Sequence, residues 1–170
     1  MFNKTILRTL GLGGSIVIIL MMTQCTARTA PALPKDILGI SVGMNKDAAQ
    51  KRLSEIGELQ SEDRETGNLW QLKDDARFRN LVVAYDAENR IKFVTALVDE
   101  KTAKERVRFS EIGDLDTAKK EVVAPNHRYT WEVAADGKPT YTVSVYGTNP
   151  EHLTIFSLTK PVEPGVPAKK

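Results

Sequence analysis

The chain is poor in the residues that build most catalytic and metal sites. It has one cysteine and two histidines in 170 residues, and a lone cysteine cannot form an internal disulfide. A zinc site needs three or four convergent ligands, so we interpret His127 and His152 as exposed loop residues. The sequence also lacks a GxSxG elbow, a P-loop, a dinucleotide fingerprint and a DxDxDG calcium loop. We therefore expect no catalytic residue, no metal and no cofactor.

The acidic residues in "KDDAR" and "DAENR" fall at predicted turns, where Asp and Asn hydrogen-bond to the backbone. No pair of them is singled out as an acid and base. A glycosidase-like pair of carboxylates from distant turns therefore remains an alternative without named residues.

An excess of one charge is also missing. The chain has 24 basic and 22 acidic residues, and Lys4 and Arg8 are the only charged residues in 1–24. Removal of 1–24 would leave 22 of each sign. Nucleic-acid binding is dominated by phosphate neutralisation by Lys and Arg, so this balance argues against a nucleic-acid partner.

The chain has no long uninterrupted apolar run. Residues 1–8 are basic, Thr9 to Ala27 carry no charge, and the densest apolar stretch is Ile16 to Met22. A membrane-spanning helix needs ~20 predominantly apolar residues, whereas here "GLGGS" places helix-weakening glycines inside the stretch. This pattern is typical of an export signal, which we assign to 1–24.

The single cysteine, Cys25, directly follows this signal and resembles the lipid-acceptor cysteine of bacterial lipoproteins. The resemblance implies an exported protein of the cell envelope, anchored to the membrane through a lipid. The alternative is an ordinary signal cut near Ala27 or at the "APA" of 30–32, which would discard Cys25 and leave a periplasmic or secreted protein. Gln24, where lipoprotein signals carry a small residue, keeps that alternative open.

Two proline-rich or small-residue segments flank the remaining chain. We interpret 25–36 as a flexible linker and 161–170 as a disordered tail, because neither can bury much apolar surface. Residues 37–160 are long enough for one modest hydrophobic core or for two small units that share one, and we assign them to an α+β domain.

The first half of the domain, 37–99, predicts a helix and three strands. Asn45 can cap the helix, Ala49, Leu53 and Ile56 share one face, and Gly57 ends it. A polar loop over 58–67 follows. The β-branched and aromatic residues of 68–74, 80–86 and 90–99 then predict an antiparallel meander.

The second half, 104–160, predicts the same elements in a weaker form. We expect a strand over 105–111 and a short helix over 113–122 that Pro125 follows. Strands over 128–134, 139–147 and 152–160 complete a second meander, with Asp136-Gly137 as a turn.

An approximate repeat relates the halves. At an offset of 61, Trp70, Tyr85 and Leu97 match Trp131, Tyr146 and Leu158, and residues 70–97 share five identities in 28 positions. We therefore predict the fold class α+β, in which a short helix on a three-stranded antiparallel meander occurs twice (37–99 and 104–160), with the two sheets separate or continuous.

The segment "ISVGMNKDAAQKRL", followed by a Trp-containing meander, resembles the BamE-like (SmpA/OmlA) small lipoproteins. The doubled arrangement resembles the tandem α/β repeats of the β-lactamase-inhibitor-protein-like fold. These resemblances imply an exported, often lipidated protein that acts by binding proteins and has no enzymatic site.

The aromatic residues of the repeat have two interpretations. Trp70 and Trp131 either anchor the core or grip a partner on an open sheet face, and we take Tyr85 and Tyr146 as the candidate binding face. The predicted function is therefore a non-enzymatic protein-binding or envelope-assembly accessory protein. The alternative is an inhibitor of a periplasmic hydrolase, or an enzyme that acts on cell-wall or sugar substrates.

Overall fold

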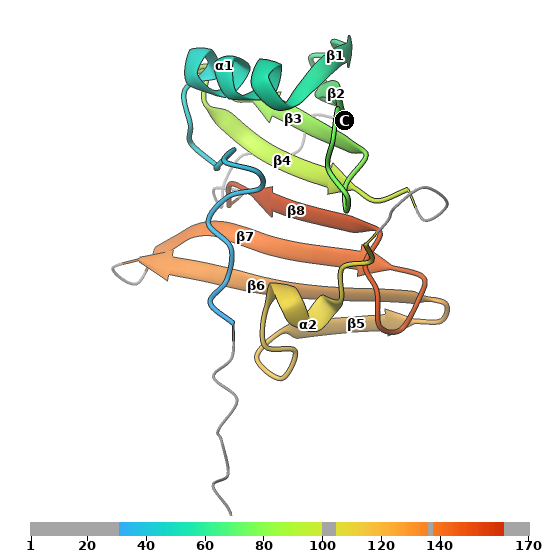
Figure 1. Cartoon of the computed structure of the whole chain (residues 1–170). Helices are drawn as coiled ribbons and strands as arrows, with labels where there is room; N and C mark the ends of the chain where they lie inside the picture. Colours follow the sequence, from blue (N-terminus) through green and yellow to red (C-terminus); the bar gives the residue numbers. More distant parts are fainter. Residues whose placement is uncertain (1–30, 100–104, 136–137, 162–170) are drawn as a thin grey trace, which may run out of the picture.

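The computed structural model describes residues 31–99, 105–135 and 138–161 (Figure 1). The signal 1–24, Cys25, the Asp136-Gly137 turn and all but the first residue of the predicted tail lie outside these ranges. Within them, no helix has the length and apolarity needed to cross a membrane.

The domain is α+β and consists mainly of one antiparallel sheet. Its strands lie in the order β1-β2-β3-β4-β8-β7-β6-β5. The two predicted meanders therefore form one continuous sheet, joined where β4 pairs with β8. The elements are α1 (Lys46–Ile56), β1 (Gly57–Ser61), β2 (Asn68–Leu72), β3 (Asn80–Tyr85), β4 (Ile91–Leu97), α2 (Phe109–Ile112), β5 (Lys119–Val123), β6 (Asn126–Ala135), β7 (Lys138–Gly147) and β8 (Ile155–Thr159).

Helix α1 forms as its sequence predicts. The side chain of Asn45 accepts a 2.8 Å hydrogen bond from the backbone N–H of Asp47, which satisfies one of the free donors of the first turn. Ala49 and Leu53 are buried against the sheet. The helix ends at Gly57, where a Cβ would lie 2.7 Å from the carbonyl oxygen of Gln71, so only glycine lets β1 approach β2 this closely.

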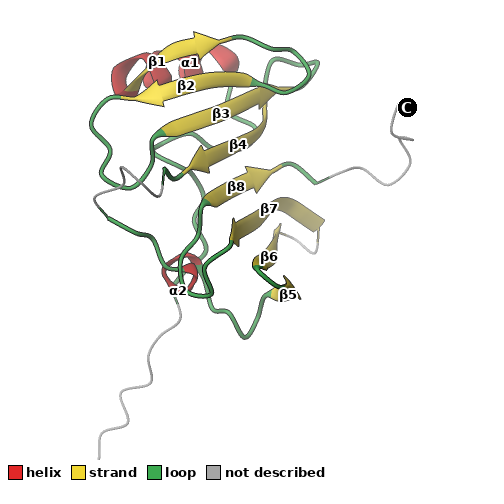
Figure 2. Ribbon diagram, turned by 90° about the vertical axis from the view of Figure 1, so that its right-hand side faces the viewer, coloured by secondary structure: helices red, strands yellow, loops and turns green. Residues whose placement is uncertain are grey.

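One face of the sheet, the covered face, holds the core. Strand register places twelve buried side chains on it: Trp70, Leu72, Leu81, Val83, Val94, Ala96, Tyr129, Trp131, Val143, Val145, Phe156 and Leu158. Complete burial of one such aliphatic side chain contributes about 2 kcal/mol. Figures 1 and 2 show α1, α2 and the N-terminal segment on this side.

The covering layer is held by specific contacts. The rings of Phe109 and Tyr129 lie 4.9 Å apart between centroids. The indole N–H of Trp131 donates to the carbonyl of Asp114 at 2.9 Å. Leu33 packs against the same core. Trp70 and Trp131 are both buried, which confirms the interpretation of both as core residues.

Three predicted elements are wrong. The loop over 58–67 contains most of β1, the strand over 105–111 is replaced by α2, and the helix over 113–122 gives way to turns and then β5. Strands β1 and β5 are the two edges of the sheet and bury almost nothing, so their residues lack the alternation that marks a half-buried strand. In α2, the backbone N–H of Arg108 donates to the Glu111 carboxylate at 2.9 Å and starts a helical turn.

The helix-on-meander repeat is not confirmed, because the second half has no counterpart of α1 and α2 has only four residues. The tryptophans do occupy matching strands, β2 and β6, on the same face. Strand pairing places Trp70 opposite Leu81 on β3 and Trp131 opposite Val143 on β7. Strands β3 and β7 therefore correspond at an offset of 62 residues, whereas the tryptophans correspond at 61. An internal duplication stays a prediction.

Candidate functional site

The opposite side of the sheet, the open face, is the main candidate surface. Its apolar side chains, including Val82, Phe93, Leu97 and Ile155, belong neither to the core cluster nor to the hydrophobics that pack on that cluster. Both helices belong to the covered side, where Ala49, Leu53, Phe109 and Ile112 join the core, and Figure 2 shows α1 behind β1 and α2 beside the lower strands. Among the described residues, therefore, no second layer covers this face.

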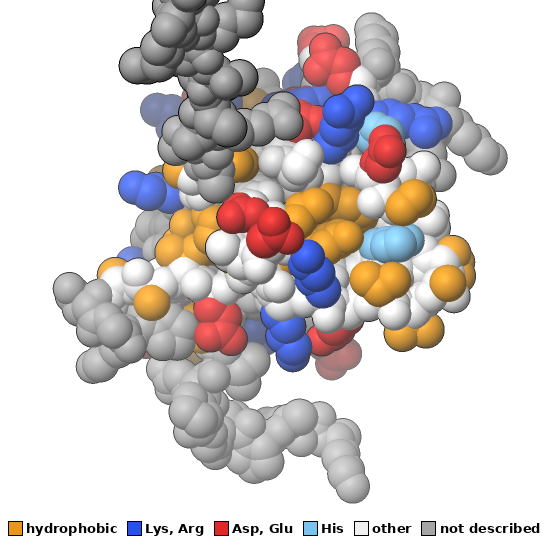
Figure 3. Space-filling model, turned by 90° about the horizontal axis from the view of Figure 1, so that it is seen from below, with side chains coloured by type: hydrophobic (Ala, Val, Ile, Leu, Met, Phe, Trp, Pro, Cys, Tyr) orange, Lys and Arg blue, Asp and Glu red, His pale blue; other side chains and the backbone are white. Residues whose placement is uncertain are grey.

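The centre of the open face carries no charge. Register assigns twelve positions of the four central strands to it: Asn80, Val82 and Ala84 on β3, Phe93, Thr95 and Leu97 on β4, Ile155, Ser157 and Thr159 on β8, and Thr142, Ser144 and Tyr146 on β7. Charged residues make up 27% of the chain, yet none occurs at these positions. Charged open-face residues begin on the outer strands, with Glu58, Lys119, Glu121, Arg128 and Glu132. Figure 3 views the molecule from below and shows basic and acidic side chains interspersed on that side.

Hydroxyl groups form a row through this centre. The hydroxyls of Thr95 and Ser157 are hydrogen-bonded at 2.9 Å across the β4–β8 junction. Ser144 lies opposite Ser157 on the next strand, and Thr142 lies opposite Thr159. The face therefore offers neutral donors and acceptors between apolar side chains, which suits contact with another uncharged surface.

A hollow of about 760 Å³, the amide hollow, opens at one end of this face. Three carboxamide side chains line it, with an apolar floor and an ion pair between Arg79 and Asp99. Its lining residues are Gln60, Leu69, Gln71, Arg79, Asn80, Leu97, Val98, Asp99, Thr148 and Thr154.

The two predicted binding tyrosines lie on opposite sides of the sheet. Tyr146 is on the open face, and its hydroxyl donates to the side-chain oxygen of Asn126. Tyr85 packs against the covered core, with the Lys46 ammonium 5.5 Å from its ring centroid. Burial raises the pKa of Tyr85, with a further contribution from the negative charge of Glu62. The structure therefore does not bring the two tyrosines together.

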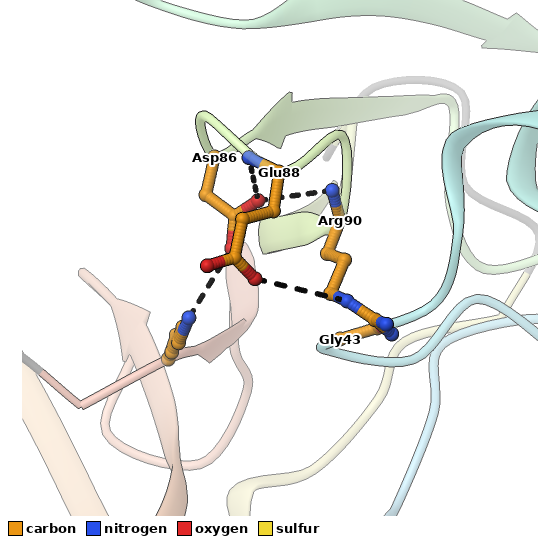
Figure 4. Close-up of polar contacts among 5 residues, drawn as sticks. Gly43, Asp86, Glu88 and Arg90 are labelled. Carbon is orange, nitrogen blue, oxygen red and sulfur yellow. Dashed lines mark hydrogen bonds and ion pairs between the residues drawn. The ribbon is translucent and has the colours of Figure 1, made fainter.

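The acidic residues at the turns accept hydrogen bonds from backbone N–H groups. Asp86 accepts backbone hydrogen bonds from Glu88 and Arg90, both at 3.0 Å, and an ion-pair contact from Lys160 at 3.2 Å (Figure 4). The Arg90 backbone hydrogen bond is the main reason that the pKa of Asp86 is lowered. Asp75 likewise accepts from two backbone N–H groups. These contacts confirm the prediction that Asp75 and Asp86 act in turns.

The histidines differ from their predicted environment. His127 lies on β6 and His152 near the start of β8, and both are half-buried instead of exposed. In the part of the chain that the structure describes, no group of three or more His, Cys, Asp or Glu side chains could hold a metal ion.

Comparison with known proteins does not assign the chain to a family. No family model, no curated protein and no solved structure matches the chain. The likeness to small envelope lipoproteins therefore stays a proposal, and the candidate site depends on the geometry of this chain alone.

Proposed function

We propose that this chain is an exported, non-enzymatic binding protein of the cell envelope, which holds a protein partner on its open face. The observation that carries the proposal is the uncharged centre of that face. A solvated sheet face usually carries polar and charged side chains, whereas the centre of a protein interface is depleted of charge and rich in apolar and aromatic groups.

The size of the face favours a protein over a small ligand. Eight strands ~4.8 Å apart span ~34 Å, and strands of about five residues are ~17 Å long, so the face covers on the order of 600 Å². A partner in a standard interface buries about 800 Å². The open face with its rim is close to that size.

The proposed membrane anchor leaves this face free. Leu33 packs on the core beneath the covered face, so the chain enters the domain from the opposite side (Figure 1). The twelve residue steps from Cys25 to Ile37 can extend at most ~40 Å. A lipid on Cys25 would thus hold the domain near the bilayer without blocking the open face. No contact among the described residues specifically favours the inhibitor or enzyme alternative, which stays a hypothesis.

Photo-crosslinking tests the proposal. A photoreactive amino acid replaces Thr95 or Ser144 on the open face and, as matched controls, Lys51 or Glu55 on the exposed side of α1. We expect both open-face positions to yield one adduct of the same mass in native membranes, and the helix positions to yield none of that mass. Crosslinking from α1 alone, or from neither surface, would overturn the proposal.

A further inference from the structure

We infer that the amide hollow receives an uncharged polypeptide loop of the partner, whose apolar side chain rests on the hollow's floor. This inference rests on the proposed function and adds the chemistry of the recognised segment. It follows from the charge, the free hydrogen-bonding groups and the floor of the hollow.

The described lining of the hollow is electrically balanced. Among the described residues, Arg79 and Asp99 are the only charged ones that line it, and they form an ion pair with each other. A charged ligand would have to compete with this contact or remain unpaired on entering the hollow, and burying an unpaired charge is costly. The hollow therefore favours a neutral segment.

Three carboxamides supply the hydrogen-bonding capacity. Gln71 and Asn80 lie directly opposite each other on β2 and β3, and Gln60 projects from β1 beside them. Their side-chain amides have no hydrogen-bond partner among the described residues. Each amide offers both a donor and an acceptor, which matches the N–H and C=O groups of a peptide backbone.

The floor favours a peptide over a sugar. It is formed by Leu69, Leu97 and Val98, and no aromatic side chain of the described residues lines the hollow. Apolar aliphatic contact suits a hydrophobic anchor residue of a partner, which binds best when such an anchor fills a desolvated pocket. The hollow is open to solvent and has a volume of about 760 Å³, so it can admit a short loop from the surface of a partner.

The test uses two neutral probes and the folded protein. The first probe is the acetylated and amidated pentapeptide Gly-Asn-Leu-Gly-Ser, whose leucine supplies the apolar anchor, and the second is a trimer of N-acetylglucosamine. We expect the peptide to shift the side-chain amide NMR signals of Gln60, Gln71 and Asn80, and the sugar to leave them unchanged. Binding of the sugar in place of the peptide, or shifts confined to other surfaces, would overturn the inference.

Variants provide the second readout. The double variant Gln71→Ala/Asn80→Ala removes two neutral hydrogen bonds, so we expect about thirtyfold weaker peptide binding. Gln50→Ala on α1 is the matched control and should bind as the wild type does. Equal affinity of all three proteins would overturn the inference. The crosslinks from Thr95 and Ser144 are an independent measurement, so the protein-binding proposal can survive that result.

Discussion

Truncation of two leucines measures which face of the sheet is covered. Leu97 and Leu158 are matched by the sequence repeat and lie on the adjacent strands β4 and β8. They point in opposite directions, because Leu97 pairs with Ile155 on the open face while Leu158 pairs with Val94 on the covered face. The same substitution therefore removes the same atoms from two different environments.

The expected losses in the free energy of unfolding differ severalfold between the two variants. Leu158 is 0% exposed in the core, and Leu→Ala at such sites costs 2–5 kcal/mol because a cavity remains. We expect about 3 kcal/mol for Leu158→Ala, which corresponds to a fall in melting temperature of roughly 10 °C. Leu97 faces the amide hollow, where no enclosed cavity would form, so Leu97→Ala should cost about 1 kcal/mol.

Urea unfolding followed by tryptophan fluorescence gives both free energies of unfolding. Trp70 and Trp131 lie in the core and should report its loss. Equal costs for the two variants would refute the assignment of faces and support a strict structural repeat at an offset of 61. A larger cost for Leu97→Ala would show that this face is the covered one.

Three further predictions concern the anchor, acid stability and packing. Cys25→Ser should move the protein from the membrane fraction to the soluble fraction, and an unchanged membrane fraction would refute lipid anchoring. The pKa of Asp86 is lowered by folding, so its charge stabilises the fold above the unfolded pKa of about 3.9 and this contribution is lost as the pH falls through the folded value. Asp86→Asn should therefore flatten the dependence of unfolding free energy on pH below about 4, and an unchanged dependence would contradict it. Gly147→Ala should destabilise the fold by about 2 kcal/mol or more, because its Cβ would collide with the backbone carbonyl of His152; calorimetry showing an unchanged melting temperature would contradict that contact.

The sequence predicts helices and strands well wherever burial of one face imposes a regular spacing of apolar residues. Helix α1 and the six inner strands appear where the patterns indicate, because each buries one face. Prediction fails at β1 and β5, because both faces of these edge strands are exposed to solvent. It also fails at α2, because the buried Val107 and Phe109 alternate with the exposed Arg106 and Arg108 as they would in a half-buried strand.

The candidate site was less accessible to sequence reasoning. The sequence predicts an open sheet face, but the strand register is needed to decide whether Tyr85 and Tyr146 lie on it. Tyr85 alternates with Leu81 and Val83 on β3 and so lies on the covered side, whereas the shift of offset from 61 to 62 places Tyr146 on the open side. A single residue of register reverses the face of a side chain, so the uncharged centre is visible only once the strands are paired.

Introduction of one charge into the open face tests the central claim most directly. Ser144→Lys places an ammonium at the uncharged centre, and Lys51→Glu alters charge on α1 as the control. Affinity for the crosslinked partner, purified and measured by calorimetry, should fall at least a hundredfold for Ser144→Lys, because the lysine would be desolvated without a partner, and should change little for Lys51→Glu. Unchanged affinity of a correctly folded Ser144→Lys protein would contradict a binding function of the open face.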